Sequence, residues 1–186
     1  KQHGHMINVG FDTYCELLEE TVQELQGEKV EKVTPTIVDI NVTAYIPDEW
    51  VGSSEQKMIE YKRLADVKTP VELDYIIEEW TDRFAKPPEC VENLIKLIRL
   101  RLSATEIKIA AIRESGDSIR IYTPYSKAEW NLVQKVLPIT ISKKIKFTQA
   151  PASCQEGSSI LILNASYVNF NEVFNILTDL FYYIHK

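Results

Sequence analysis

Residues 46–84 constrain the fold most, because they contain two helix starts whose capping residues can be read directly from the sequence. Ser53 followed by Gln56 has the spacing of a capping box, in which two side chains satisfy free backbone N–H groups at a helix start. Thr69 and Glu72 repeat this spacing, with a proline at the favourable first helical position between them. The sequence therefore predicts helices that begin after residues 53 and 69.

The second of these helices has two contrasting faces. Its apolar residues recur at helical spacing and should be buried: Leu73, Ile76, Ile77, Trp80 and Phe84. Another face carries Glu72, Tyr75, Glu79 and Asp82. Such a stripe is usually a solvated surface, since amphipathic helices carry charge on their outer side. An acidic stripe with one tyrosine can also be a docking face, so both interpretations stay open at this point.

Composition is that of a globular chain. The 186 residues are 45% apolar and 26% charged, enough for one good core. No apolar run has the length of a membrane span, and the first residues lack a signal-peptide pattern, so we expect a cytoplasmic chain with no membrane partner. The three cysteines, Cys15, Cys90 and Cys154, are far apart and form no CxxC pair, which predicts buried thiols rather than disulfides or a zinc site.

Charge is distributed unevenly along the chain. The net charge is −6, and residues 1–30 hold six acids against two lysines. Neither this part nor the remainder has the basic excess of a nucleic-acid-binding domain. An apolar stripe predicts a helix over residues 11–25, and the stretch 27–36 lacks periodicity. We therefore divide the chain into residues 1–30 and a main domain of residues 31–186.

The main domain has the pattern of an α+β fold. Strand-like alternation occurs at residues 37–45, 107–111, 119–121, 139–141 and 145–147, with a continuous apolar run at 160–163, and further helices are expected over 91–102 and after residues 126 and 169. The helices are grouped partly ahead of the strands. This order predicts a small, mostly antiparallel sheet packed with about five or six helices, preceded by the separate N-terminal helix.

No enzyme signature is present in the sequence. It contains no GxxxxGK[ST], GxGxxG, HExxH or GxSxG motif. Of the three histidines, His3 and His5 form an HxH pair without a third metal ligand nearby, and His185 is penultimate. We expect no catalytic residues and no metal site, and a binding or regulatory role for the main domain.

Two segments resemble a known family. Residues 2–22 (QHGHMINVGFDTYCELLEETV) are similar to the end of the translocation motif shared by bacterial transcription-repair coupling factors (Mfd) and RecG helicases. The pattern of the coupling factors' C-terminal domain follows in order: IPD at 46–48, YKR at 61–63, DRF at 82–84, proline at 88 and VENL at 91–94. The family usually has glycine after DRF, where this chain has Ala85, which puts the geometry of that helix end in question.

The resemblance implies a C-terminal piece of an ATP-driven double-stranded DNA translocase. Such proteins displace stalled RNA polymerase and recruit nucleotide-excision repair through UvrA. In the family, the C-terminal domain masks the UvrA-binding module in the resting state, which implies autoinhibition for residues 31–186. Gln2 and Gly4 would be the remnant of the translocation motif. No cofactor is implied for this piece, whereas ATP and Mg²⁺ serve the parent protein.

The resemblance also favours the docking interpretation of Glu72, Tyr75, Glu79 and Asp82, because Asp82 lies in the DRF motif. Two alternatives remain. One is an unrecognised enzyme that uses carboxylates, and the other is a nucleic-acid-binding module. Only Lys143, Lys144 and Lys146 beside Phe147 support the second, and such lysines more often protect an edge strand.

Overall fold

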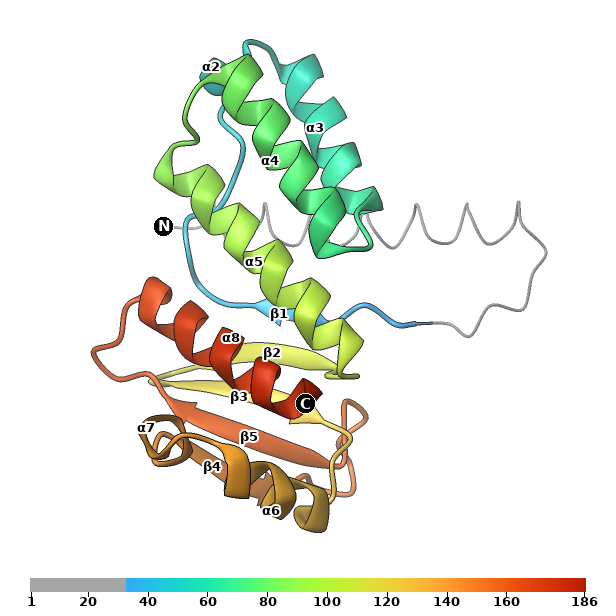
Figure 1. The fold of residues 1–186 in the computed structure, drawn as a ribbon, viewed down its shortest axis with the longest axis vertical. Helices are drawn as coiled ribbons and strands as arrows, with labels where there is room; N and C mark the ends of the chain where they lie inside the picture. Colours follow the sequence, from blue (N-terminus) through green and yellow to red (C-terminus); the bar gives the residue numbers. More distant parts are fainter. Residues whose placement is uncertain (1–32) are drawn as a thin grey trace, which may run out of the picture. The chain divides into compact units, whose positions relative to one another are not determined.

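The computed structural model describes residues 33–186, which form seven helices and one five-stranded sheet (Figure 1). Their contacts divide them into two compact units. We call residues 41–99 the helical unit, and residues 33–40 with 100–186 the sheet unit. The predicted helix over residues 11–25 and the boundary near residue 30 lie outside the described residues, and both stay predictions.

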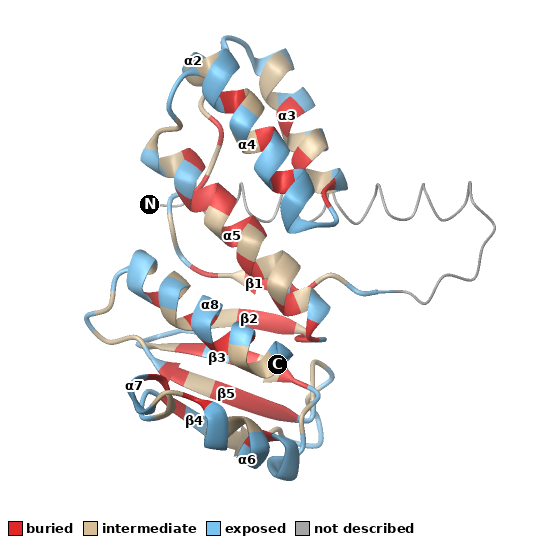
Figure 2. Cartoon of the chain, viewed as in Figure 1, coloured by how far each residue is buried: buried red, intermediate tan, exposed pale blue. Residues whose placement is uncertain are grey.

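The helical unit is built from α2 (Asp48–Val51), α3 (Ser54–Asp66), α4 (Pro70–Phe84) and the first part of α5 (Glu89–Glu106). The predicted apolar face of α4 supplies much of its core, since Leu73 and Trp80 are fully buried and Ile76 is nearly so (Figure 2). Ile77 and Phe84 are only half-buried. Val91, Leu94 and Leu97 of α5 complete the core.

The sheet unit contains β1 (Ile37–Asp39), β2 (Ala111–Ser115), β3 (Ser118–Thr123), β4 (Ile145–Gln149) and β5 (Ser159–Asn164), with α6 (Lys127–Val136), α7 (Ile139–Ser142) and α8 (Phe170–His185). The strand order is β1-β2-β3-β5-β4, and only the β1–β2 pairing is parallel. This architecture confirms the predicted α+β fold with a mostly antiparallel sheet. None of the helices described in residues 33–186 is long and apolar enough to cross a membrane.

Three predicted strands differ from the structure. The first ends at Asp39 instead of residue 45, because the following backbone pairs with α5: Tyr45 N donates to Cys90 O at 3.1 Å. The second begins only at Ala111, since α5 continues to residue 106 and Lys108 adopts a φ of 62°. Residues 139–141 belong to the short helix α7. The strand prediction was wrong here because apolar spacing alone does not separate a short strand from a helical turn.

The end of α4 stores backbone strain. Ala85 has a φ of 71° and a ψ of −175°, a conformation that only glycine adopts without cost. The departure from the glycine of the resembled family therefore falls at the position where glycine is needed.

Replacing Ala85 with glycine is expected to raise the free energy of unfolding by about 1 kcal/mol, because the relieved strain exceeds the added chain entropy. Urea denaturation would measure it. The matched control is Ala128→Gly inside α6, where glycine should instead cost up to about 1 kcal/mol. A loss of stability in both variants would contradict the inference that the backbone of Ala85 is strained.

Candidate docking site

The predicted caps position α3 and α4. Ser53 Oγ accepts from Gln56 N at 3.1 Å, but the Gln56 side chain does not return to the cap. Thr69 and Glu72 form the complete capping box, with Glu72 N donating to Thr69 Oγ1 and Thr69 N donating to Glu72 Oε2, both at 3.3 Å. Lys68 N donates to the same carboxylate at 2.7 Å. Glu72 therefore serves the fold of α4 first.

A buried carboxylate joins the two helices. Glu60 on α3 is fully buried, which is rare for a charged side chain. Trp80 Nε1 of α4 donates to its Oε2 at 2.6 Å, and Gln56 Nε2 donates to its Oε1 at 2.9 Å. Arg63 Nη1 lies 3.1 Å from Oε2, and Arg83 Nη1 lies 3.6 Å from Oε1. Because a buried charge must be paired, this network ties α3 to α4.

The same two arginines hold Glu79 at the surface. Arg63 donates through Nη2 to Glu79 Oε2 at 2.5 Å and through Nη1 to Oε1 at 3.2 Å. Arg83 Nη1 donates to Oε1 at 2.9 Å. These bonds, from Arg63 first and Arg83 second, lower the pKa of Glu79, and Glu79 in turn raises the pKa of Arg63. A partner would have to compete with two arginines for this carboxylate.

Aromatic rings support the end of α4. Trp50 packs edge-on against Trp80 and against Phe84, with ring centroids 5.4 Å apart in both pairs. The Arg83 guanidinium lies over the Phe84 ring, 4.8 Å from its centroid. The arginine of the DRF motif is thus held by a carboxylate on one side and a ring on the other.

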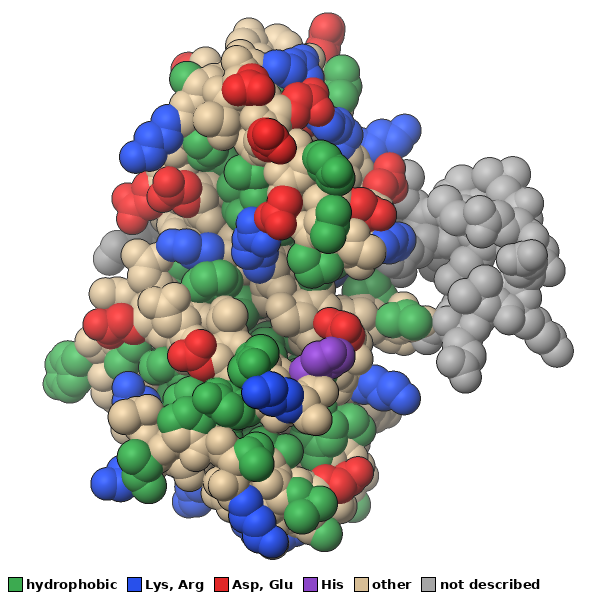
Figure 3. Space-filling view, in the orientation of Figure 1, with side chains coloured by type: hydrophobic (Ala, Val, Ile, Leu, Met, Phe, Trp, Pro, Cys, Tyr) green, Lys and Arg blue, Asp and Glu red, His purple; other side chains and the backbone are tan. Residues whose placement is uncertain are grey.

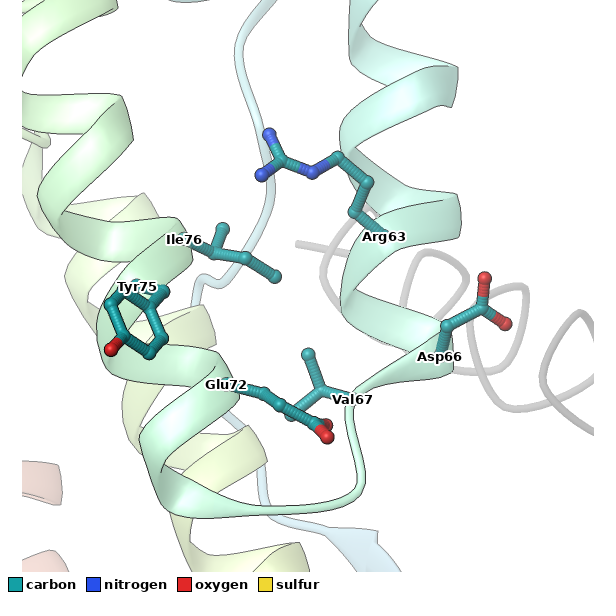
Figure 4. A pocket seen from close by; sticks show the side chains of 6 residues that line it. All are labelled: Arg63, Asp66, Val67, Glu72, Tyr75 and Ile76. Atoms are coloured by element: carbon teal, nitrogen blue, oxygen red, sulfur yellow. The ribbon is translucent and has the colours of Figure 1, made fainter.

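Three exposed side chains of α4, those of Val71, Tyr75 and Asp82, take no part in the contacts described above. Tyr75 is 69% exposed and Val71 is 61% exposed. Asp82 is exposed and forms no ion pair with any residue in the range 33–186. A shallow hollow lies beside Tyr75, between the end of α3 and the start of α4 (Figure 4); it is lined by Arg63, Asp66, Val67, Glu72, Tyr75 and Ile76. Tyr75, which is exposed beside the hollow, and Asp82, which is exposed elsewhere on the same helix, are suited to protein contact.

The four predicted docking residues therefore differ in how far their side chains are already engaged within the domain. Glu72 caps its helix, Glu79 is paired, and Tyr75 and Asp82 are open. Gln2 and Gly4 lie outside the described residues.

The sequence analysis missed the arginine pair and the buried glutamate. Local spacing does contain a signal for them, because Glu60 and Arg63 are three residues apart, and Glu79 and Arg83 are four residues apart. The contact of Glu60 with Trp80 spans twenty residues and leaves no local trace.

Other candidate sites change in the structure. Phe147 stacks on Trp130 with centroids 6.3 Å apart, while Lys146 of the same strand is exposed, so these two residues do not form a joint stacking platform for bases. Cys90 and Cys154, for which buried thiols were predicted, are free thiols that are half-buried; burial raises the pKa of Cys90. No cluster of three or more potential metal ligands occurs within residues 33–186.

Comparison with known proteins gives the class of this domain. Residues 40–131 match the family model of the TRCF domain. The fold is similar to the crystal structure of the C-terminal domain of a transcription-repair coupling factor, with a TM-score of 0.64 and 17% identity, covering 82% of this chain and 94% of that one. The helical unit and the start of the sheet unit thus carry a TRCF domain.

Curated relatives agree with this class. Over 123 residues, or 65% of the chain, it is 37% identical to the transcription-repair-coupling factor of Staphylococcus epidermidis and 32% identical to that of Bacillus subtilis. Over 139 residues, or 74% of the chain, it is 34% identical to that of Staphylococcus aureus. The chain belongs to the transcription-repair coupling factor family. The matched part spans only 10% to 12% of these relatives' length.

Proposed function

We propose that this chain is the regulatory C-terminal part of an ATP-dependent DNA translocase, and that its helical unit masks the UvrA-binding module of the same protein in the resting state. The parent protein would bind ATP, Mg²⁺ and double-stranded DNA outside this chain and would displace stalled RNA polymerase. In this proposal the chain itself is not an enzyme. Gln2 and Gly4 would belong to the translocation motif of the motor.

One observation carries the masking proposal: the exposed side of α4 presents Tyr75 and Asp82 together, with Glu79 fixed next to them. Tyrosine is enriched at protein interfaces because its ring offers area and its hydroxyl offers a hydrogen bond. Asp82 is an unpaired carboxylate within the described residues, available for an arginine or lysine of the masked module. The ion pairs of Glu79 with Arg63 and Arg83 fix the negative charge of Glu79 next to Asp82, which reduces the entropy lost on docking.

The test is Asp82→Lys in the full-length protein. A charge-assisted hydrogen bond contributes about 1.5 to 3 kcal/mol, so its loss should raise UvrA affinity without DNA or ATP by roughly tenfold or more. Asp82 is the better choice than Glu79, because a lysine at position 79 would also repel Arg63 and Arg83. Binding would be measured by fluorescence anisotropy with labelled UvrA.

Asp179→Lys is the matched control, since Asp179 is an exposed aspartate in the middle of α8 in the sheet unit. It should leave UvrA affinity unchanged. Equal affinities of both variants and the unsubstituted protein would remove Asp82 from the interface.

A further inference from the structure

A second surface, on α6 and α7 of the sheet unit, combines exposed apolar side chains with lysines. Leu132, Val136 and Ile139 are 63%, 58% and 64% exposed. We call these three residues the α6–α7 stripe. Leu132 and Val136 lie one turn apart on the same side of α6. Trp130 on the opposite side is fully buried and stacks on Phe147, so the helix cannot turn its apolar stripe inward.

The surroundings of the stripe are basic. Residues 127–149 contain five lysines and a single acid, in a chain whose net charge is −6. That acid, Glu129, is used by the helix cap: Ser126 N donates to its Oε2 at 2.7 Å, and this bond lowers the pKa of Glu129. Lys135, Lys143 and Lys144 are exposed and form no ion pair with any residue from 33 to 186. The positive charge is therefore not compensated locally.

The lysines follow the apolar residues at helical spacing. Lys135 is three residues after Leu132, and Lys143 is four residues after Ile139, with Lys143 N donating to Ile139 O at 3.2 Å. Hydrophobic and basic side chains also lie next to each other at the lower edge of Figure 3, the part of the molecule in which Figure 1 places α6. A ligand of this surface must offer apolar groups and negative charge at the same spacing.

Three kinds of partner carry negative charge, and the apolar stripe distinguishes them. Duplex DNA is bound mainly through its phosphates and offers no counterpart for three exposed aliphatic side chains. A lipid surface is bound by a helix with a large apolar face, often with Trp or Phe on it, whereas the only large apolar side chains that α6 exposes are Leu132 and Val136, and its tryptophan is buried. An amphipathic helix provides apolar anchors at i, i+4 and i+7, with acids at its flanks.

We propose that the α6–α7 stripe docks an acidic amphipathic helix of a partner protein. Leu132, Val136 and Ile139 receive the apolar anchors of that helix, and Lys135, Lys143 and Lys144 pair with its acids. The surface lies in the sheet unit and shares no residue with the docking face of α4. The docking proposal for the α6–α7 stripe can therefore be tested independently of the masking function.

The probe is a stapled helical peptide with leucines at i, i+4 and i+7 and glutamates at the flanking positions. We expect the chain of residues 1–186 to bind it in fluorescence anisotropy, and Val136→Glu to weaken binding about tenfold or more. Lys135→Glu combined with Lys143→Glu should also weaken binding and reduce its dependence on salt. Leu132→Gln serves as a second variant if circular dichroism shows that Val136→Glu is misfolded.

Matched controls separate a specific site from general stickiness. Val71→Glu replaces a valine of similar exposure, 61%, on α4, and it should bind the peptide as the unsubstituted chain does. A peptide of the same composition whose leucines do not share a face should bind poorly.

Four outcomes would overturn the proposal. First, the designed peptide does not bind. Second, Val71→Glu and Val136→Glu weaken peptide binding equally. Third, the unsubstituted chain binds duplex DNA or anionic vesicles and Val136→Glu abolishes that binding, or, fourth, the chain self-associates and Val136→Glu abolishes the self-association. The last three would reassign the surface to nonspecific contact, to nucleic acid or lipid, or to a second copy of the chain.

Discussion

Replacing Glu60 with alanine is expected to lower the free energy of unfolding of the helical unit by about 3 to 5 kcal/mol, the range for breaking a buried ion pair. Trp80 Nε1 and Arg63 Nη1 both donate to the Glu60 carboxylate, so the change leaves both donors without this acceptor. Native-state hydrogen exchange of the α3 and α4 amides would measure the effect within this unit. Glu60→Gln keeps an acceptor for Trp80 and should cost less.

Glu78→Ala is the control for Glu60→Ala. Glu78 is an exposed glutamate on α4, and its replacement should change stability by no more than about 0.5 kcal/mol. If Glu60→Ala cost as little as Glu78→Ala, the network would not be what joins α3 to α4.

Replacing Trp80 with phenylalanine is expected to cost clearly more than the same change at Trp130, although both tryptophans are fully buried. Trp80→Phe removes a hydrogen bond to a charged group and some ring volume, which together correspond to about 2 to 4 kcal/mol. The Trp130 Nε1 atom has no hydrogen-bond partner among the described residues, so Trp130→Phe loses packing alone.

The difference between the two variants should be at least about 1 kcal/mol. Hydrogen exchange read separately at α4 and at α6 would measure it, and each helix serves as the control for the other. The combination Trp80→Phe with Glu60→Ala should cost less than the sum of the single changes, because both remove the same hydrogen bond. Strict additivity, or equal costs of the two tryptophan changes, would contradict a special role for the Trp80 to Glu60 bond.

Local sequence signals predicted the elements whose chemistry is itself local. The Thr69 to Glu72 box is present in the structure, and the helices expected after residues 126 and 169 begin there with side-chain caps from Ser126 and Asn169, because a cap depends on residues three positions apart. The docking face of α4 was predicted in the same way, from helical spacing, and stays a prediction. Spacing placed Glu79 and Asp82 on one side of the helix, but it could not distinguish a paired carboxylate from a free one.

Features decided by distant residues were not predictable from local pattern. Glu60 looks like any other glutamate of an amphipathic helix until Trp80 is placed against it. Residues 40–45 alternate like a strand, and Ile40 and Ala44 are indeed buried, but Tyr45 N donates to Cys90 O and Thr43 O accepts from Asn93 Nδ2, both outside a sheet. Residues 139–141 became a helical turn because Pro138 O accepts from Ile141 N and Ser142 N. In the first two cases tertiary contacts overrode a short-range preference, whereas the turn at residues 139–141 rests on local hydrogen bonds that apolar spacing does not reveal.

The parallel pairing of β1 with β2 has a consequence for the order of folding. Ile37 pairs with Ala111, so this ladder closes a loop of about 70 residues, whereas β2 and β3 are joined by a two-residue turn. Loop closure costs entropy before any contact compensates for it, and synthesis at about 5 to 20 residues per second separates the two strands by several seconds. The β2–β3 hairpin can therefore form without β1, whereas β1 cannot pair until the whole intervening helical unit and β2 have been synthesised.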